Sequence, residues 1–493
     1  MVRKLCLCVL TMGLVLSPAV SADSIEAELQ ELKSKIAELE QLKARVQELE
    51  QRVNEVPDEP RPPAEEELSL DEIVAAMRQE EPEPAPTPSP TLAAPSTGLH
   101  GGLQSFNPDI SVIFNALYHN DTYGDGIGSI FDSIDGFEAR DAQDFDKGFQ
   151  IEEIELFIEA EIDPFFAGYV NFIFTEDNVE LEEAVVRTTS LPYGLELKGG
   201  KFFSDFSRAN WMHPHDWDFA DRPLTSNLFF GEDGLNQTGV QVSWLAPTDF
   251  HLLLGAEFLQ GDNDDMYQYF GPGDSDGVLS RHSGPRTMVQ WAKYSPYLEG
   301  DHEAQIGVFH GYGRHQDEWD FAPDITGWTQ GHSRFLGTDF VYKYDAPYAH
   351  GHGNVTLQGE YIYRKRDTDL RGYSGDGGPG DLSLLGNSRV DEQDGYYLQG
   401  IYGFAPQWRT GLRWEQVGLL NRSRVPNPQD ERNKSHGNSR RLTAMVDFTP
   451  SDFARFRLQG SRGDYQIDGS REDVYQVMFQ MIFSLGAHGA HKF

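Results

Sequence analysis

One stretch of the chain, residues 204–235, gathers side chains that could bind a metal or steer ions. It holds histidine, carboxylate, arginine and tryptophan groups at close spacing, namely Trp211, His213, His215, Asp216, Asp218, Asp221 and Arg222. Imidazole nitrogens and carboxylate oxygens are ligands for zinc or copper. His213 and His215 are therefore candidate metal ligands, although a His-Pro-His-Asp run in a loop can also serve only to cap turns.

The spacing of these two histidines argues against tight binding of one ion. Residues two apart in an extended chain project to opposite faces, and a single residue separates His213 from His215. We therefore expect the segment to narrow a pore and to show only a weak zinc effect. We expect no cofactor. The alternative is that acidic or histidine-containing loops bind calcium or zinc.

Two further groups of charged residues alternate with apolar neighbours. Late in the chain these are Arg409, Arg413, Arg441, Arg455 and Arg457, and early in the chain they are Glu153, Glu155, Glu159 and Glu161. Alternating residues of a strand share one face, so the sequence predicts a basic and an acidic wall. Opposed walls would set up a transverse electric field across a pore. The alternative interpretation, that these charges simply form ion pairs inside a hydrated lumen, has equal weight.

The elements that must position these side chains are strands. Residues 99–493 show two-residue alternation in sixteen segments: 109–119, 147–162, 166–174, 179–190, 194–203, 236–246, 250–260, 286–295, 302–313, 332–345, 353–365, 394–405, 408–418, 438–449, 453–463 and 471–485. Seven short, proline-containing turns alternate with eight other connections, most of them long and rich in Asp, Gly, Asn and Arg. This asymmetry predicts an all-β fold, a sixteen-stranded antiparallel transmembrane β-barrel with both termini on the periplasmic side.

The last predicted strand shows which face meets which surroundings. Tyr475, Val477, Phe479, Met481, Phe483 and Leu485 share one face, and Gln476, Gln480 and Ser484 share the other. The apolar face should meet lipid and the polar face the lumen. The aromatic residue Phe493 at the end of the sequence is typical of outer-membrane barrels.

The first 98 residues predict three different segments. Residues 1–22 have the charged, apolar and small-residue regions of a secretory signal peptide, which also holds both cysteines. Residues 23–56 carry a heptad seam that indicates a periplasmic coiled coil, and self-association is the better interpretation than a lone amphipathic helix. Residues 57–98 are a proline-rich linker with one short helix, and the barrel occupies 99–493.

Composition excludes several classes of function. The net charge of −39 argues against nucleic-acid binding, because a phosphate backbone requires a basic face. No apolar run reaches the length of a membrane-spanning helix. Nothing resembles a Gly-x-Ser-x-Gly nucleophile turn, so we expect no enzyme.

Several motifs bear a family resemblance. Residues 106–111 (FNPDIS), 162–166 (IDPFF), 191–194 (LPYG), 198–202 (KGGKF) and 211–219 (WMHPHDWDF) resemble the phosphate-selective porin O and P family, including porin-like proteins labelled zinc-regulated outer-membrane receptors. The resemblance implies a trimeric, sixteen-stranded channel for small solutes in the bacterial outer membrane. The family's arginine and lysine ladders have no match here, so phosphate selectivity does not carry over.

These observations predict a porin for passive diffusion of small hydrophilic solutes or ions. Its partners would be the lipid bilayer, lipopolysaccharide and two further copies of the chain. One alternative is a zinc- or metal-related uptake protein, although an energised receptor would need a globular plug and about twenty-two strands. The other is an envelope tether whose coiled coil contacts peptidoglycan.

Overall fold

The computed structural model describes residues 108–124, 127–137, 139–176, 178–271, 278–322, 325–374, 388–429 and 433–486. The predicted signal peptide, coiled coil and linker lie outside these described residues, as does Phe493. Everything below concerns the described part of the chain.

Sixteen long antiparallel strands and one two-residue strand make up the sheet within the described residues. The long strands are β1 (Asp109–Asp121), β2 (Gly148–Asp163), β3 (Phe166–Phe174), β4 (Val179–Thr188), β5 (Leu195–Phe203), β6 (Asn236–Leu245), β7 (His251–Leu259), β8 (Thr287–Ser295), β9 (His302–Ala322), β10 (Ile325–Tyr344), β11 (Val355–Ser374), β12 (Ser388–Ala405), β13 (Trp408–Arg424), β15 (Ser439–Ser451), β16 (Ala454–Ile467) and β17 (Ser470–Gly486). The short strand β14 (Lys434–Ser435) pairs only with β13. The predicted count of sixteen is confirmed.

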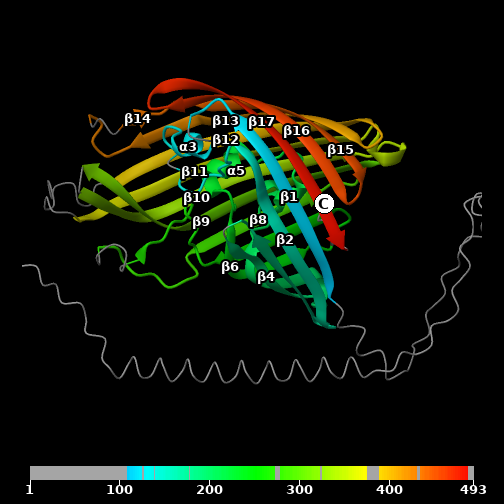
Figure 1. The fold of residues 1–493 in the computed structure, drawn as a ribbon. Coiled ribbons are helices and arrows are strands. Elements are labelled where there is room, and N and C mark those ends of the chain that lie inside the picture. Colours follow the sequence, from blue (N-terminus) through cyan, green and yellow to red (C-terminus); the bar gives the residue numbers. More distant parts are fainter. Residues whose placement is uncertain are drawn as a thin grey trace, which may run out of the picture. The chain divides into compact units, whose positions relative to one another are not determined.

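The sheet closes on itself (Figure 1). Each long strand pairs with its neighbours in the chain, and β1 pairs with both β2 and β17, for example Leu117 opposite Gln480. Closure leaves no free sheet edge, so every strand satisfies its backbone groups within the barrel.

The helical elements are short. They are α3 (Ile127–Asp132), α4 (Arg208–Trp211), α5 (Leu224–Phe230) and the 3₁₀ turns η2 (Pro192–Gly194), η3 (Pro214–Asp216) and η4 (Ala349–Gly351). Within the described residues, none of these helices is long and apolar enough to cross a membrane.

Several strands are longer than the sequence predicts. β9 and β10 continue to residues 322 and 325, where the sequence pattern predicts a long loop from 314 to 331. Cross-strand pairing persists there through polar partners such as Gln330 opposite Gln316. A pattern search that requires one apolar face misses a hairpin whose buried face is largely polar, as at Gln316 and Thr329.

The two faces of the barrel differ in chemistry. In β17, Tyr475 and Leu485 are exposed on the outer face, whereas Gln476 and Gln480 are buried on the inner face. The same holds in β16, where Leu458 is 57% exposed and its neighbours Arg457 and Gln459 are 1% and 2% exposed. The predicted division between apolar outer and polar inner faces is confirmed in these strands.

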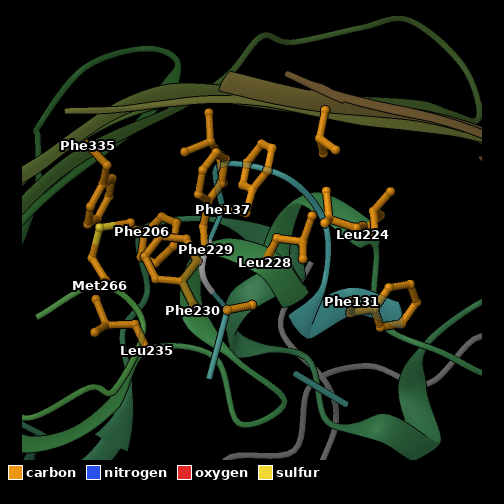
Figure 2. Packing of buried hydrophobic residues seen from close by; sticks show 14 of the residues in the cluster. Phe131, Phe137, Phe206, Leu224, Leu228, Phe229, Phe230, Leu235, Met266 and Phe335 are labelled. Carbon is orange, nitrogen blue, oxygen red and sulfur yellow. The ribbon is translucent and has the colours of Figure 1, made fainter. Parts of the chain in front are cut away.

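The interior also contains an apolar core, which the sequence analysis does not predict. Segments between strands supply most of it, and Figure 2 shows Phe131, Phe137, Phe206, Leu224, Leu228, Phe229, Phe230, Leu235 and Met266 gathered with Phe335 of the wall. The ring of Phe335 lies 5.1 Å from the rings of Phe206 and Phe230. It lies over Gly311 of the adjacent strand, where a Cβ would come within 2.2 Å of the ring.

This packing predicts opposite results for two adjacent residues of β10. Phe335 is fully buried inside, while Leu336 is 56% exposed outside. Phe335→Ala should lower the free energy of unfolding by about 3–5 kcal/mol, the usual cost of such a cavity, and Leu336→Ala should change it little. Denaturant unfolding of both variants in detergent micelles measures this. Equal effects would show that the core does not lie inside the barrel.

Candidate functional site

The segment between β5 and β6, residues 204–235, is here called the inner loop. Most of its side chains are buried, including all seven residues of α5. Its contacts reach strands all around the barrel: the Asp205 backbone N–H donates to Glu257 of β7, Arg208 N–H to Asp339 of β10, Leu224 N–H to Glu415 of β13 and Ala220 N–H to Gln459 of β16. The inner loop therefore lies across the interior of the barrel.

Asp221 joins the inner loop to the arginines of the late strands. Its two carboxylate oxygens lie 2.7 Å from Arg413 Nη2 and 2.5 Å from Arg441 Nη1. Glu415 accepts from Arg441 Nε at 2.6 Å, so the two guanidinium groups share two carboxylates. Burial alone would raise the pKa of Asp221, but Arg413 and Arg441 outweigh it and lower that pKa to about 2.

The other three predicted arginines also meet the inner loop. Arg409 pairs with Asp218 at 3.2 Å and with Asp447 at 2.7 Å. Two inner-loop carbonyl oxygens accept from the remaining pair, His215 O from Arg455 Nη1 at 3.0 Å and Trp217 O from Arg457 Nη2 at 2.7 Å. All five arginines thus line one side of the interior, and the inner loop covers them.

His213 and His215 approach the opposite side, formed by early strands. Glu155 Oε2 of β2 lies 2.9 Å from His215 Nδ1 and 3.7 Å from His213 Nδ1. The expectation that these histidines project to opposite faces is wrong. Pro214 begins the turn η3 directly after His213, so the chain is not extended there, and the two ring centroids are 5.6 Å apart.

The two neighbouring glutamates of β4 are functional candidates that the sequence analysis missed. Glu182 Oε2 lies 3.2 Å from His213 Nδ1, and Glu183 Oε2 lies 3.1 Å from His213 Nε2. Consecutive strand residues normally face opposite ways. Here the register shifts between Asn171 and Phe172 of β3, which leaves Glu182 in a bulge and lets both carboxylates reach the interior.

The other predicted site residues are spread more widely. Glu153 is buried beside Glu155, Glu159 pairs with Arg187 at 3.2 Å, and Glu161 is exposed near the short-turn end of β2. Within the inner loop, Asp216 Oδ1 lies 3.6 Å from His215 Nε2.

Two aromatic residues of the inner loop accompany arginines. The buried Arg222 lies over the Trp217 ring at 5.1 Å, and Arg208 lies over Trp211 at 5.6 Å. Gly234 makes room for Arg222, because a Cβ there would meet its Nη1 at 2.6 Å. These contacts fix side chains within the inner loop itself.

Free space in the interior differs along the barrel. A cavity of about 710 Å³ opens near the short turns and is lined by His215, Asp216, Arg455 and residues of the β15–β16 turn. A cavity beside Asp221, also lined by Trp217 and Gln399, holds only about 20 Å³. The inner-loop residues near Asp221 thus border little free space, and those near the short turns border much more.

The buried ion pairs predict a large effect for Asp221 and a small one for Asp218. Asp221→Asn leaves two buried guanidinium groups short of a carboxylate and should cost about 3–5 kcal/mol. Asp218→Asn, whose partner Arg409 is 30% exposed, should cost about 1 kcal/mol or less. Hydrogen exchange of the inner-loop amides and denaturant unfolding measure both variants.

The lowered pKa of Asp221 fixes the pH window of this contribution. A carboxylate with a folded-state pKa of about 2 stabilises the fold fully above its unfolded value near 4, and the stabilisation is lost as pH falls from about 4 to about 2. Wild-type inner-loop protection should therefore be the same at pH 7 and pH 5. A loss between these two values would contradict this account of Asp221.

Comparison with known proteins gives one sequence relative and several structural likenesses. Among solved structures, OprB of Pseudomonas putida superposes with a TM-score of 0.47 at 10% identity, covering 78% of this chain and 95% of that one. The outer membrane channel DcaP of Acinetobacter baumannii gives a TM-score of 0.45 at 13% identity, covering 77% and 96%. At such low identities no role of these proteins is carried over to this chain.

No family model matches the sequence. A protein of Aquifex aeolicus (strain VF5), described only as uncharacterized, is 32% identical over 409 residues, which are 79% of this chain and 81% of that protein. Identity at that level over most of both sequences shows common descent, and the chain therefore belongs to the same family as this Aquifex aeolicus protein.

Proposed function

We propose that this protein is a porin of the bacterial outer membrane, which passes small hydrophilic solutes or ions and is narrowed by the inner loop. One observation carries the proposal: a closed barrel has an apolar outer face and an inner face lined by charged and amide side chains. Such a barrel suits lipid outside and water inside.

The outer surface supports insertion in a membrane. Exposed leucines occur along strands, for instance Leu412 at 60% and Leu442 at 47%. Exposed aromatic residues occupy the short turns at one end, namely Phe165, Tyr193, Phe250, Tyr297, Tyr348 and Phe453. An aromatic girdle at one end of an apolar band is typical of outer-membrane barrels at the lipid–water interface.

The finer features of the proposal extend the sequence analysis. Three copies would assemble, with the coiled coil of residues 23–56 in the periplasm, where it could contact peptidoglycan. Divalent cations would bridge acidic outer loops to lipopolysaccharide. Metal-related uptake is a second candidate function, favoured by the convergence of His213, His215 and Glu155.

The first test is conduction. The purified protein in planar bilayers should give discrete current steps, in groups of three if it is a trimer, because each barrel would conduct separately. Mass measurement in detergent checks the oligomer. A folded, membrane-inserted protein that gives no current would overturn the porin proposal, and single steps with a monomeric mass would overturn only the trimer.

The second test asks whether the inner loop is a fixed constriction. A Cβ built on Gly395 of β12 lies 3.1 Å from Thr225 Cγ2 and 3.2 Å from Thr225 Oγ1 of α5. In a disulfide each sulfur lies roughly 3 Å from the opposite Cβ. The double variant Thr225→Cys with Gly395→Cys should therefore form a disulfide that locks α5 to the barrel wall. The Val417 methyl lies 2.8 Å from the Cβ position of residue 395 and must shift slightly to make room.

A fixed constriction predicts equal conductance in the oxidised and reduced forms of the double variant. The predicted mature chain has no other cysteine, so the lock is unambiguous. Gly395→Cys alone is the matched control. A current that falls on oxidation and returns with a thiol reductant would show instead that the inner loop moves away from β12 in the conducting state.

A further inference from the structure

Three side chains from two parts of the chain bring possible metal ligands together beside the inner loop. One ring nitrogen from each of His213 and His215 and a carboxylate oxygen of Glu155 all lie within 4.8 Å of one another. Glu182 is a neighbour of this group: its Oε2 lies 3.2 Å from His213 Nδ1 and accepts from Asn171 Nδ2 at 2.7 Å. Ligand atoms that lie 2.0–2.1 Å from a tetrahedral zinc ion are roughly 3.3 Å from one another. Glu155 Oε2 lies 2.9 Å from His215 Nδ1 and 3.7 Å from His213 Nδ1, which are distances around that value.

We propose that Glu155, His213 and His215 bind one divalent cation of the zinc class. Two imidazoles with a carboxylate form a mixed nitrogen and oxygen set, which suits zinc, whereas calcium and magnesium prefer oxygen alone. The proposal concerns binding, and it does not require that the barrel conducts.

Glu155 and the two histidines lie together in a buried position. Glu155 is 1% exposed, and its Oε2 lies 2.9 Å from His215 Nδ1 and 3.7 Å from His213 Nδ1. A buried carboxylate needs positive charge beside it. A cation bound among these three atoms would supply that charge.

The second ring nitrogen of His213, Nε2, contacts a carboxylate, as is usual for histidine ligands in metal sites. Histidine ligands usually donate their other N–H to a carboxylate, which fixes the ring. His213 Nε2 lies 3.1 Å from Glu183 Oε2. Glu183 is itself fixed, since its Oε1 accepts from the Tyr169 hydroxyl at 3.0 Å.

Charge balance favours a dication on this side of the interior. The five arginines of the late strands face four carboxylates, those of Asp218, Asp221, Glu415 and Asp447. On the opposite side four glutamates, Glu153, Glu155, Glu182 and Glu183, lie near His213, His215 and Lys198, and Lys198 is already paired with Asp205 at 2.7 Å. A divalent ion would offset most of the remaining negative charge, which is expensive to bury unpaired.

The ion has a route to this point. The cavity of about 710 Å³ near the short turns is lined by His215 and Asp216 and is open to that end of the barrel. Bound there, the cation would join β2 to the inner loop. Its ligands come from separate elements, as in tight metal sites, and the barrel wall would hold Glu155 rigidly.

The test is zinc titration of the full-length, chelator-treated protein in detergent, followed by calorimetry at pH 8. The expected result is one tightly bound zinc per chain. His213→Ala with His215→Ala should weaken binding at least 100-fold, and Glu183→Gln should weaken it about 10- to 100-fold, as expected for a partner of a ligand. The matched control is His350→Ala with His352→Ala, a second His-x-His pair, which lies in and directly after the turn η4 and should leave the affinity unchanged.

A wild-type measurement keeps the proposal open to refutation if a variant does not fold. Zinc K-edge absorption of the one-to-one complex should show two imidazoles and carboxylate oxygen in the first shell. A shell of oxygen alone, absence of binding at micromolar zinc, or an affinity that His213→Ala with His215→Ala leaves unchanged would each overturn the site. These measurements do not depend on conductance. A failure of the metal-site proposal can therefore be distinguished from a failure of the porin proposal.

Discussion

The constraint on which the rest of the interior depends is that charges removed from bulk water need partners of opposite sign. The barrel buries arginines on its late strands, such as Arg413 and Arg441, and glutamates on its early strands, such as Glu153 and Glu155. The inner loop lies between them and presents aspartates to the arginines and histidines to the glutamates. Removing one member of such a pair costs far more than the net gain from forming it, so the charge pattern specifies a single position for the inner loop.

The apolar core works together with this charge pattern. Phe206 and Phe230 of the inner loop pack on Phe309 and Phe335 of the wall, and Phe229 packs on Phe137 from the segment before β2. Burial of apolar surface alone would tolerate sliding, because the hydrophobic effect is non-directional. The ion pairs around Asp221 add direction, and the apolar residues exclude the water that would otherwise weaken those pairs.

The sequence was sufficient for the barrel but only partly for its interior. Alternation and turn length predicted sixteen strands and the two faces of β17, because strand period and proline-containing turns are local properties. The convergence of His213 and His215 depends on the turn at Pro214, and the inward direction of both Glu182 and Glu183 depends on a bulge against β3. Neither feature follows from a simple two-residue period. The interior core also escaped prediction, since many of its members come from segments that read as loops.

The two sides of the inner loop are held by different kinds of charge, which determines where it can loosen. Arginine stays protonated at any physiological pH, and the charges of Arg413 and Arg441 outweigh burial and hold the pKa of Asp221 at about 2, so that side stays charged. Burial lowers the pKa of His213, but Glu182 and Glu155 outweigh it and hold that pKa well above its ordinary value. The positive charge on the histidine side thus depends on a bound proton or cation, both exchangeable. Any opening of the inner loop should therefore begin at His213 and His215, beside the larger cavity, with the Asp221 side as the fixed end.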